Sequence, residues 1–220
     1  MYNSDALTDQ TNLPAPSDTS TTVPTAMDSV LEAMRETVRT MFTDNPQPRY
    51  HYRRGREYEF QILVNGEDYE FEVPAPLMCI SSGHFSDVSQ CATVDGATFD
   101  YVQINLWGYS RDVVGTVLEL VYRLDRPDGI ISRLLFPCLS TNTLERCSGL
   151  THMLEVLRLA NEWRMPKIKR LIQLALIADG VVPVEDFAYV RGIAEATKAT
   201  ILLKRCNEIL GRVDGSVGVA

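Results

Sequence analysis

Four side chains carrying the groups of a hydrolase stand close together in the sequence. Ser82, His84, Ser86 and Asp87 offer the hydroxyl, imidazole and carboxylate groups that activate a nucleophile in acyl transfer. Such groups work when the fold holds the serine on an exposed turn of the form Gly-x-Ser-x-Gly, beside an oxyanion hole. That form does not occur in this sequence, so we expect Ser82 to bond to the backbone of its own helix. We predict no catalytic residues and no enzyme activity.

Metal binding is a second chemistry that the side chains suggest. Cys138, Cys147 and His152 come nearest to a zinc-ligand set, but their spacing is not a known paired form and a fourth ligand is missing. The five cysteines include no Cys-x-x-Cys pair, and the 13 glycines form no phosphate-binding loop. We therefore expect reduced, mostly buried thiols, and neither a metal site nor a cofactor.

One basic and aromatic cluster, at residues 49–56, suggests contact with phosphate or RNA. Its sequence, Arg-Tyr-His-Tyr-Arg-Arg-Gly-Arg, combines cations with rings that stack on bases. The same residues also suit a solvated linker. Because the net charge is −8 and no further basic stretch follows, we do not expect a nucleic acid as a partner, and the role of the cluster stays open.

The composition predicts a folded core preceded by a polar tail. Of 220 residues, 45% are hydrophobic and 23% are charged, as in globular domains. Residues 1–26 are rich in Ser, Thr, Asp and Pro, so we expect a disordered tail. The longest apolar run, 171–178, is too short to cross a membrane. Because the start of the chain has no basic and apolar leader, we expect a cytoplasmic or nuclear protein without a membrane partner.

An amphipathic helix is predicted over residues 27–43. Ser29 and Glu32 have the spacing of a capping box, and apolar residues recur on one helical face. The polar face, with two arginines against two glutamates, is a poor match for an anionic membrane. We therefore expect the apolar face to pack on protein, in a homodimer. The residues predicted for this interface are Val30, Leu31, Met34, Val38, Met41 and Phe42.

The rest of the chain has the pattern of a small sheet followed by helices. Apolar residues first alternate, as in strands, and later recur every three or four positions, as in helices. We expect a long connection with one short element over 125–149, where Pro, Gly and Asn are frequent. The whole order predicts an α+β fold with a small sheet, a helical cluster and a helical extension. The predicted strands are 60–64, 69–73 and 102–106, and the predicted helices are 77–80, 83–88, 111–122, 150–160, 166–175, 184–197 and 200–210.

Five segments in this order resemble a BTB/POZ domain over residues 57–178. In the strongest, Val73–Phe85, the pair Leu77-Met78 matches an apolar pair of the family, and Ser82 and Phe85 match its Ser and Phe three apart. Residues 183–211 resemble the two-helix start of the BACK domain that often follows. Pro74 in place of the usual His, and the long connection, depart from the family. The other four segments are the opening strand at 59–66, Ile104-Asn105-Leu106, the helix ending in Leu120-Val121-Tyr122, and 159–166 with its apolar-Pro entry into the next helix.

The resemblance implies dimerisation and the binding of another protein. Glu59 stands where the family usually has Asp in its dimer core, so it joins the predicted dimer interface. Family members that bind cullins use the helix of the Ser–Phe pair and the loop after it, which implies partner contacts at Phe85, Val88 and Gln90. Gln90 replaces a glutamate often found there and loses its charge, so weak or absent cullin binding is expected.

We therefore predict a protein–protein interaction module that homodimerises and recruits a protein partner, as a scaffold or adaptor. Two alternatives stay open. One is a ubiquitin-ligase adaptor that binds a cullin scaffold, and the other is a transcriptional regulator that contacts nucleic acid through residues 49–56. Trp163 is expected in the core, whereas Trp107 fits either a core or an interface.

Overall fold

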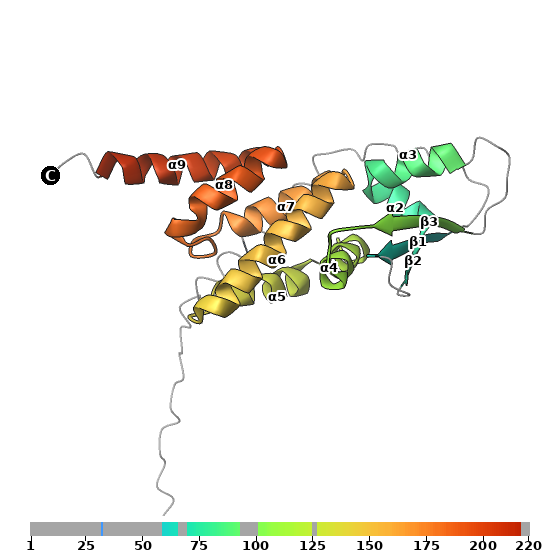
Figure 1. Cartoon of the computed structure of the whole chain (residues 1–220), viewed down its shortest axis with the longest axis horizontal. Coiled ribbons are helices and arrows are strands. Elements are labelled where there is room, and N and C mark those ends of the chain that lie inside the picture. Colours follow the sequence, from blue (N-terminus) through green and yellow to red (C-terminus); the bar gives the residue numbers. More distant parts are fainter. Residues whose placement is uncertain (1–31, 33–58, 66–69, 93–100, 125–126, 217–220) are drawn as a thin grey trace, which may run out of the picture.

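The computed structural model describes residue 32 and residues 59–65, 70–92, 101–124 and 127–216. In chain order, the elements are β1 (Glu59–Val64), β2 (Glu70–Pro74), α2 (Ala75–Ser81), α3 (Gly83–Ala92), β3 (Tyr101–Leu106), α4 (Arg111–Tyr122), α5 (Asp128–Cys138), α6 (Thr143–Glu162), α7 (Pro166–Leu176), the 3-10 helix η1 (Val184–Asp186), α8 (Phe187–Ala196) and α9 (Thr200–Ser216). The described part is α+β and elongated (Figure 1). The sheet with α2 and α3 forms one end, α4 to α7 lie in the middle, and α8 and α9 form the other end.

The sheet has the strand order β2-β1-β3, so β1 is central. β1 pairs antiparallel with β2 and parallel with β3, and α2 and α3 supply the crossover that a parallel pair needs. Phe60, Ile62 and Val64 are all buried, as their alternation predicts. Asn65 follows with a φ of 55°, a left-handed conformation that asparagine tolerates better than most residues.

Asn65 also fixes the chain as it leaves β3. Its backbone N–H donates to the Leu106 carbonyl (2.8 Å). Its side-chain oxygen accepts from the Gly108 N–H (2.9 Å), and its side-chain nitrogen donates to the Tyr109 carbonyl (2.7 Å). Gly108 has a φ of 81°, which glycine adopts without steric cost. The segment between β3 and α4 is therefore held in one path.

α4 follows the predicted boundaries, Arg111–Tyr122. The Ser110 hydroxyl accepts from the Val113 N–H (3.3 Å), which satisfies one of the free donors at the start of the helix. The apolar face of α4 is buried in the common core, where the helix packs against α6 and α2. This packing joins the sheet end of the molecule to the helical middle.

The long connection with one short element that was expected over 125–149 is wrong, because α5 and the start of α6 occupy most of this segment. Asp128, Gly129 and Pro137 read as helix breakers in the sequence. Asp128 and Gly129 instead open α5, and Pro137 lies in its last turn, where it removes a single backbone donor from the helix. Asn142 then caps α6, because its side chain accepts from the backbone N–H of Leu144 (3.0 Å).

α5 and α6 approach closely at Gly149. A Cβ atom at this position would lie 2.7 Å from the Cβ of Pro137 and 2.9 Å from the backbone nitrogen of Cys138. Atoms at such distances overlap, so only glycine permits this spacing of the two helices. Gly149 is therefore a packing residue inside α6 and not a helix end.

α8 and α9 are fastened to α7 by polar side chains. Lys169 donates to the Thr197 carbonyl at the end of α8. Gln173, one turn further along α7, is buried, and its side-chain oxygen accepts from the Ile201 N–H (3.1 Å) at the start of α9. These contacts satisfy helix-end groups that burial would otherwise leave without partners.

Several predicted segments lie outside the described residues. They are the tail at 1–26, the cluster at 49–56 and the helix at 27–43, apart from Glu32, which is helical and exposed. The predicted extension is described, and it consists of η1 with α8, followed by α9. The predicted dimer-interface residues that lie outside the described ranges are Val30, Leu31, Met34, Val38, Met41 and Phe42.

The contact at Gly149 generates a first prediction. We expect Gly149→Ala to lower the free energy of unfolding by about 1–3 kcal/mol, because its methyl group overlaps the backbone of α5. Gly192→Ala in α8 is the matched control, since a Cβ there meets nothing within 4 Å, and it should stabilise the protein by about 0.5–1 kcal/mol. Urea denaturation of both variants measures the difference. Equal stability changes in the two variants would contradict this account of the α5–α6 contact.

Candidate functional site

Ser82 links the start of α3 to the junction of α6 with α7 by hydrogen bonds. Its hydroxyl donates to the Trp163 carbonyl and accepts from the Phe85 N–H (3.2 Å), which confirms the predicted bond to its own helix. The Gly83 N–H donates to the Arg164 carbonyl (3.1 Å). Because Ser82 is buried and its hydroxyl hydrogen is engaged, the group serves the packing of α3.

The residues next to Ser82 also contact the junction of α6 with α7. Arg164 donates to the Gly83 carbonyl (2.8 Å) and forms an ion pair with Asp87. Burial, followed by the charge of Arg164, lowers the pKa of His84. Arg164 therefore holds the Asp87 carboxylate, the group that would have to orient a catalytic histidine.

Phe85 lies in the core, which corrects its assignment to a partner-binding surface. Its side chain is 0% exposed, and its ring packs edge-on against the rings of Phe60 and Trp163, with centroids 4.8 and 5.0 Å away. A side chain so buried does not reach a partner. Val88 is half-buried and Gln90 is exposed, so the prediction of partner contacts stays with these two residues.

The position of Phe85 generates a prediction about stability. We expect Phe85→Ala to cost about 3–5 kcal/mol, because the change removes a fully buried ring. Phe71→Ala is the comparison, and it should cost less, since Phe71 is only partly buried against the same core. Thermal and urea denaturation of the two variants test the order. An equal or larger loss in Phe71→Ala would show that the centre of the core is misplaced.

Glu59, which the resemblance assigns to a dimer interface, is exposed at the start of β1. Its neighbours across the sheet are Pro74 on β2 and Tyr101 on β3. Burial, followed by the charge of Glu59, raises the pKa of Tyr122 at the end of α4. Tyr101 and Tyr122 are both exposed, so Glu59 lies near aromatic side chains of the kind that are enriched at interfaces.

The three residues considered as zinc ligands have different environments. Cys138 is buried, which raises the pKa of its thiol to about 11, and the thiol donates to the sulfur of Met153 (3.4 Å). Cys147 is exposed, and His152 bonds to Thr116. In the described ranges, no group of three or more His, Cys, Asp or Glu side chains is placed to hold a metal ion.

A groove of about 530 Å³ opens between α4, α5 and α6. Its apolar lining is formed by Ile130, Leu134 and Pro137 on α5, together with Leu144 on the first turn of α6. Leu144 is 80% exposed, so a large apolar side chain stands in water at this site. The volume lies within the ~300–1,000 Å³ typical of binding pockets.

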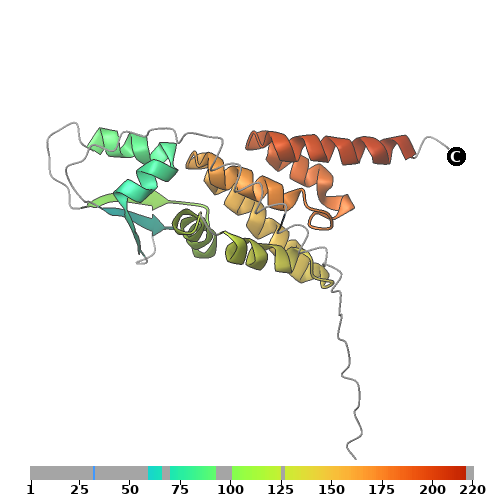
Figure 2. The same cartoon turned by 180° about the vertical axis from the view of Figure 1, so that it is seen from behind.

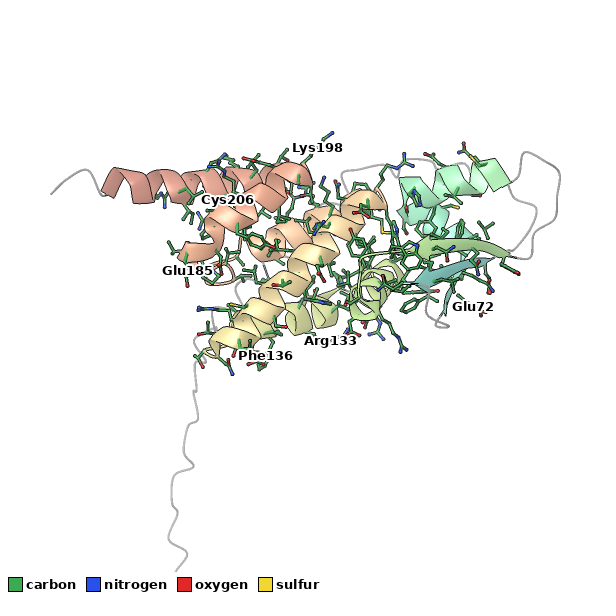
Figure 3. The ribbon with its side chains drawn as sticks, viewed as in Figure 1. Glu72, Arg133, Phe136, Glu185, Lys198 and Cys206 are labelled. Atoms are coloured by element: carbon green, nitrogen blue, oxygen red, sulfur yellow. The ribbon has the colours of Figure 1, made fainter. Side chains whose placement is uncertain are left out.

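Polar side chains line the same groove. Arg133 on α5 donates to Glu119 on α4, and Thr116 Oγ1 lies 3.2 Å from Nε2 of His152 on α6 (Figure 3 labels Arg133). Arg133 neutralises Glu119, whereas among the described residues Glu145 accepts only from the uncharged hydroxyl of Ser140 (2.6 Å). With His152 neutral, the lining carries one net negative charge, at Glu145.

Among the residues that the structure describes, the pair of Thr116 and His152 lacks the other parts of a catalytic site. Burial lowers the pKa of His152, and the charges of Asp112 and Glu155 oppose this shift. Within the described part of the chain, neither carboxylate accepts a hydrogen bond from the ring. Thr116 also lies in the interior of α4, away from the helix N-terminus where backbone N–H groups would stabilise an oxyanion. The groove is therefore suited to binding.

The sequence alone does not predict this groove. Because the sequence predicts a long connection with one short element over 125–149, it does not predict that a helix there forms one wall of the groove. Ile130, Leu134 and Pro137 stand at the spacing i, i+4 and i+7, which is the signal that predicts one face of a helix. Pro137 obscured this signal, because proline normally argues against a helix.

The buried imidazole of His152 generates a prediction about pH. Because its pKa is lower in the folded than in the unfolded chain, protonation favours unfolding, and stability is lost as the pH falls below about 6.5. We expect His152→Gln to lose less stability than the wild-type protein between about pH 7.5 and about pH 5.5. Burial also lowers the pKa of His84, so this residue contributes to the loss of stability that remains in His152→Gln. The variant His84→Gln measures that contribution. Melting temperatures across this range that shift equally in wild type and His152→Gln would contradict the assignment.

No protein-family model matches this sequence, and no curated protein matches it. Among the residues that the structure describes, no helix is both long and apolar enough to cross a membrane. The fold and the groove together define an α+β protein with an open groove between three helices.

Proposed function

We propose that this protein is a protein-interaction module, a scaffold or adaptor without catalytic activity. In this proposal it binds a segment of a partner protein in the groove between α4, α5 and α6, and it associates with itself. The observation that carries the proposal is the groove, where the exposed side chain of Leu144 and the charge of Glu145 stand beside an apolar wall. This combination fits a protein segment with one apolar anchor.

The apolar lining supplies the affinity in this proposal. Burying a leucine or phenylalanine side chain of the partner contributes about 1.5–3 kcal/mol. Leu144 adds to this term, because its own exposed side chain also leaves water on binding. The walls are held in place by the ion pair of Arg133 with Glu119 and by the contact at Gly149. A groove preformed in this way has little ordering entropy to overcome.

The charge of the lining indicates what accompanies the anchor. Glu145 carries the net negative charge of the groove, and its partner Ser140 leaves that charge in place. A lysine or arginine beside the anchor would complement it, whereas an acidic segment would be repelled. The proposed ligand is therefore an apolar and basic protein segment.

The BTB/POZ resemblance supports the same class of function. Its five segments fall on β1, α2 with α3, β3, α4, and the junction of α6 with α7, in the expected order. The connection that departed from the family is occupied by α5 and the start of α6, and α8 with α9 stands where the two-helix extension is expected. Self-association is supported by the exposed Tyr101 and Tyr122 near Glu59.

Selection from a displayed library of random peptides on the full chain tests the groove. We expect the enriched peptides to combine a Leu, Phe or Trp with a nearby Lys or Arg. Leu144→Glu should weaken their binding at least about tenfold, because it places a charge where the anchor sits. Fluorescence anisotropy with a labelled peptide measures the affinity.

The control variant is Val184→Glu, which adds the same charge at another exposed apolar residue, on η1, that is not part of the groove lining. This variant should bind the peptides as the wild-type protein does. Peptides that bind Leu144→Glu and wild type equally, or an enriched set that is acidic, would overturn the proposed site.

A further inference from the structure

The two edges of the sheet differ in how they are protected. β2 carries Glu70, Glu72 and Pro74, and Figure 3 shows Glu72 at the sheet end of the molecule. Charged residues and proline on an edge strand prevent further strands from pairing. β3, with the sequence Tyr-Val-Gln-Ile-Asn-Leu, contains neither a charged residue nor a proline. The β3 edge therefore has none of the protection that the β2 edge has.

The β3 edge is also open among the residues that the structure describes. Within the described residues, β3 pairs with β1 alone, and none of its six residues is buried. The carbonyl of Leu106 points to β1, where it accepts from the Asn65 N–H. Because backbone groups alternate in direction along a strand, those of Tyr101, Gln103 and Asn105 point away from the sheet. Three residues thus offer both a donor and an acceptor to an added strand.

Large aromatic side chains stand exposed at both ends of this edge. Tyr101, the first residue of β3, is 53% exposed, and Trp107, just after its last residue, is 67% exposed. The bond from the Gly108 N–H to Asn65 holds the backbone that follows Trp107. Aromatic pairs across neighbouring strands stabilise a sheet, so the two rings are suited to contact an added strand.

We propose that the β3 edge pairs antiparallel with β3 of a second copy of this chain, across a two-fold axis at Ile104. In this register Tyr101 lies opposite Trp107 of the second copy, and Val102 lies opposite Leu106. Gln103 lies opposite Asn105, and the outward backbone groups of both strands meet as hydrogen-bonded pairs. In the combined sheet, the face that packs on the core in one copy is continuous with the same face of the second copy.

The second copy is the occupant because the edge is complementary to itself. A shift of the two-fold axis to Gln103 also keeps the faces aligned, but it leaves Trp107 outside the paired residues. The axis at Ile104 gives each exposed aromatic ring a partner and pairs apolar side chains with apolar ones on the core face. It also places no charged residue inside the paired strands. An interface built from one patch on both copies is the usual form of a homodimer.

Disulfide trapping of the full chain tests the pairing directly. Ile104→Cys is made in a Cys91→Ser, Cys147→Ser background, which removes the exposed thiols. Residues on the axis face each other in a non-hydrogen-bonded pair, whose short separation suits a disulfide. With oxidised glutathione we expect a covalent dimer at least about fivefold more abundant than with Glu72→Cys, the control on the protected edge. Equal cross-linking of the two variants would overturn the proposal.

Paired charge substitutions test the register. Gln103→Lys with Asn105→Lys places lysine opposite lysine twice and should abolish the pairing. Gln103→Lys with Asn105→Glu places lysine opposite glutamate and should restore it, which only the axis at Ile104 allows. Light scattering should give about twice 24.7 kDa for the wild-type and restored chains, and a smaller mass for the double lysine variant. Unchanged masses in all variants would contradict the β3 pairing.

The inference rests on the proposed self-association, and the outcomes separate the two. A concentration of tens of micromolar is high enough to detect even a dimer of modest affinity. A wild-type chain that is monomeric at this concentration would overturn both proposals. A dimer that the β3 variants leave intact, but that Val38→Asp in the predicted helix disrupts, would overturn the β3 pairing alone. Peptide binding in the groove is measured independently of either result.

Discussion

The architecture depends on one contact, in which the start of α3 meets the end of α6. A helix start has free N–H groups, and a helix end has free carbonyls. Here the N–H groups of Gly83 and His84 donate to the carbonyls of Arg164 and Trp163, and the Ser82 hydroxyl adds a third bond to Trp163. The donors at one end therefore bind acceptors at the other, which lowers the cost of burying both ends. The contact also sets the ring of Phe85 between those of Phe60 and Trp163, which joins the sheet to the helices through aromatic packing.

Hydrogen bonds to helix ends also hold α8 and α9 at the other end of the molecule. α7 presents Lys169 to the carbonyl end of α8 and Gln173 to the N–H end of α9, so a single helix satisfies both ends of the turn between them. Burial, followed by the charge of Lys198, lowers the pKa of Lys169, but the carbonyl of Thr197 gives its ammonium group a partner. Such hydrogen bonds fix the relative orientation of the helices more strictly than apolar packing does. The extension therefore belongs to the same packed body as the sheet.

Local patterns in the sequence were sufficient to predict the elements that depend on local physics. The alternation of Phe60, Ile62 and Val64, and the cap at Ser110, correctly placed β1 and α4. The pattern failed where tertiary contacts decide. Gly149 reads as a breaker until its contact with α5 is known, and Phe85 reads as a surface residue when a family's binding helix is transferred onto it. The groove was missed for the same reason, because a site between three helices is specified only once all three are placed.

The arrangement of surfaces bears on how a scaffold of this kind would work. α4 separates the sheet from α5 in Figure 1 and again from behind in Figure 2, so the β3 edge and the groove belong to different parts of the molecule. Pairing at β3 would therefore leave both grooves of a dimer open. A partner with two copies of the recognised segment would then bind the second groove at the high effective concentration that its linker sets. Modest affinity at each groove, which is what one apolar anchor and one charge provide, is enough under this arrangement. Self-association would thus convert a weak recognition site into a selective one for multivalent partners.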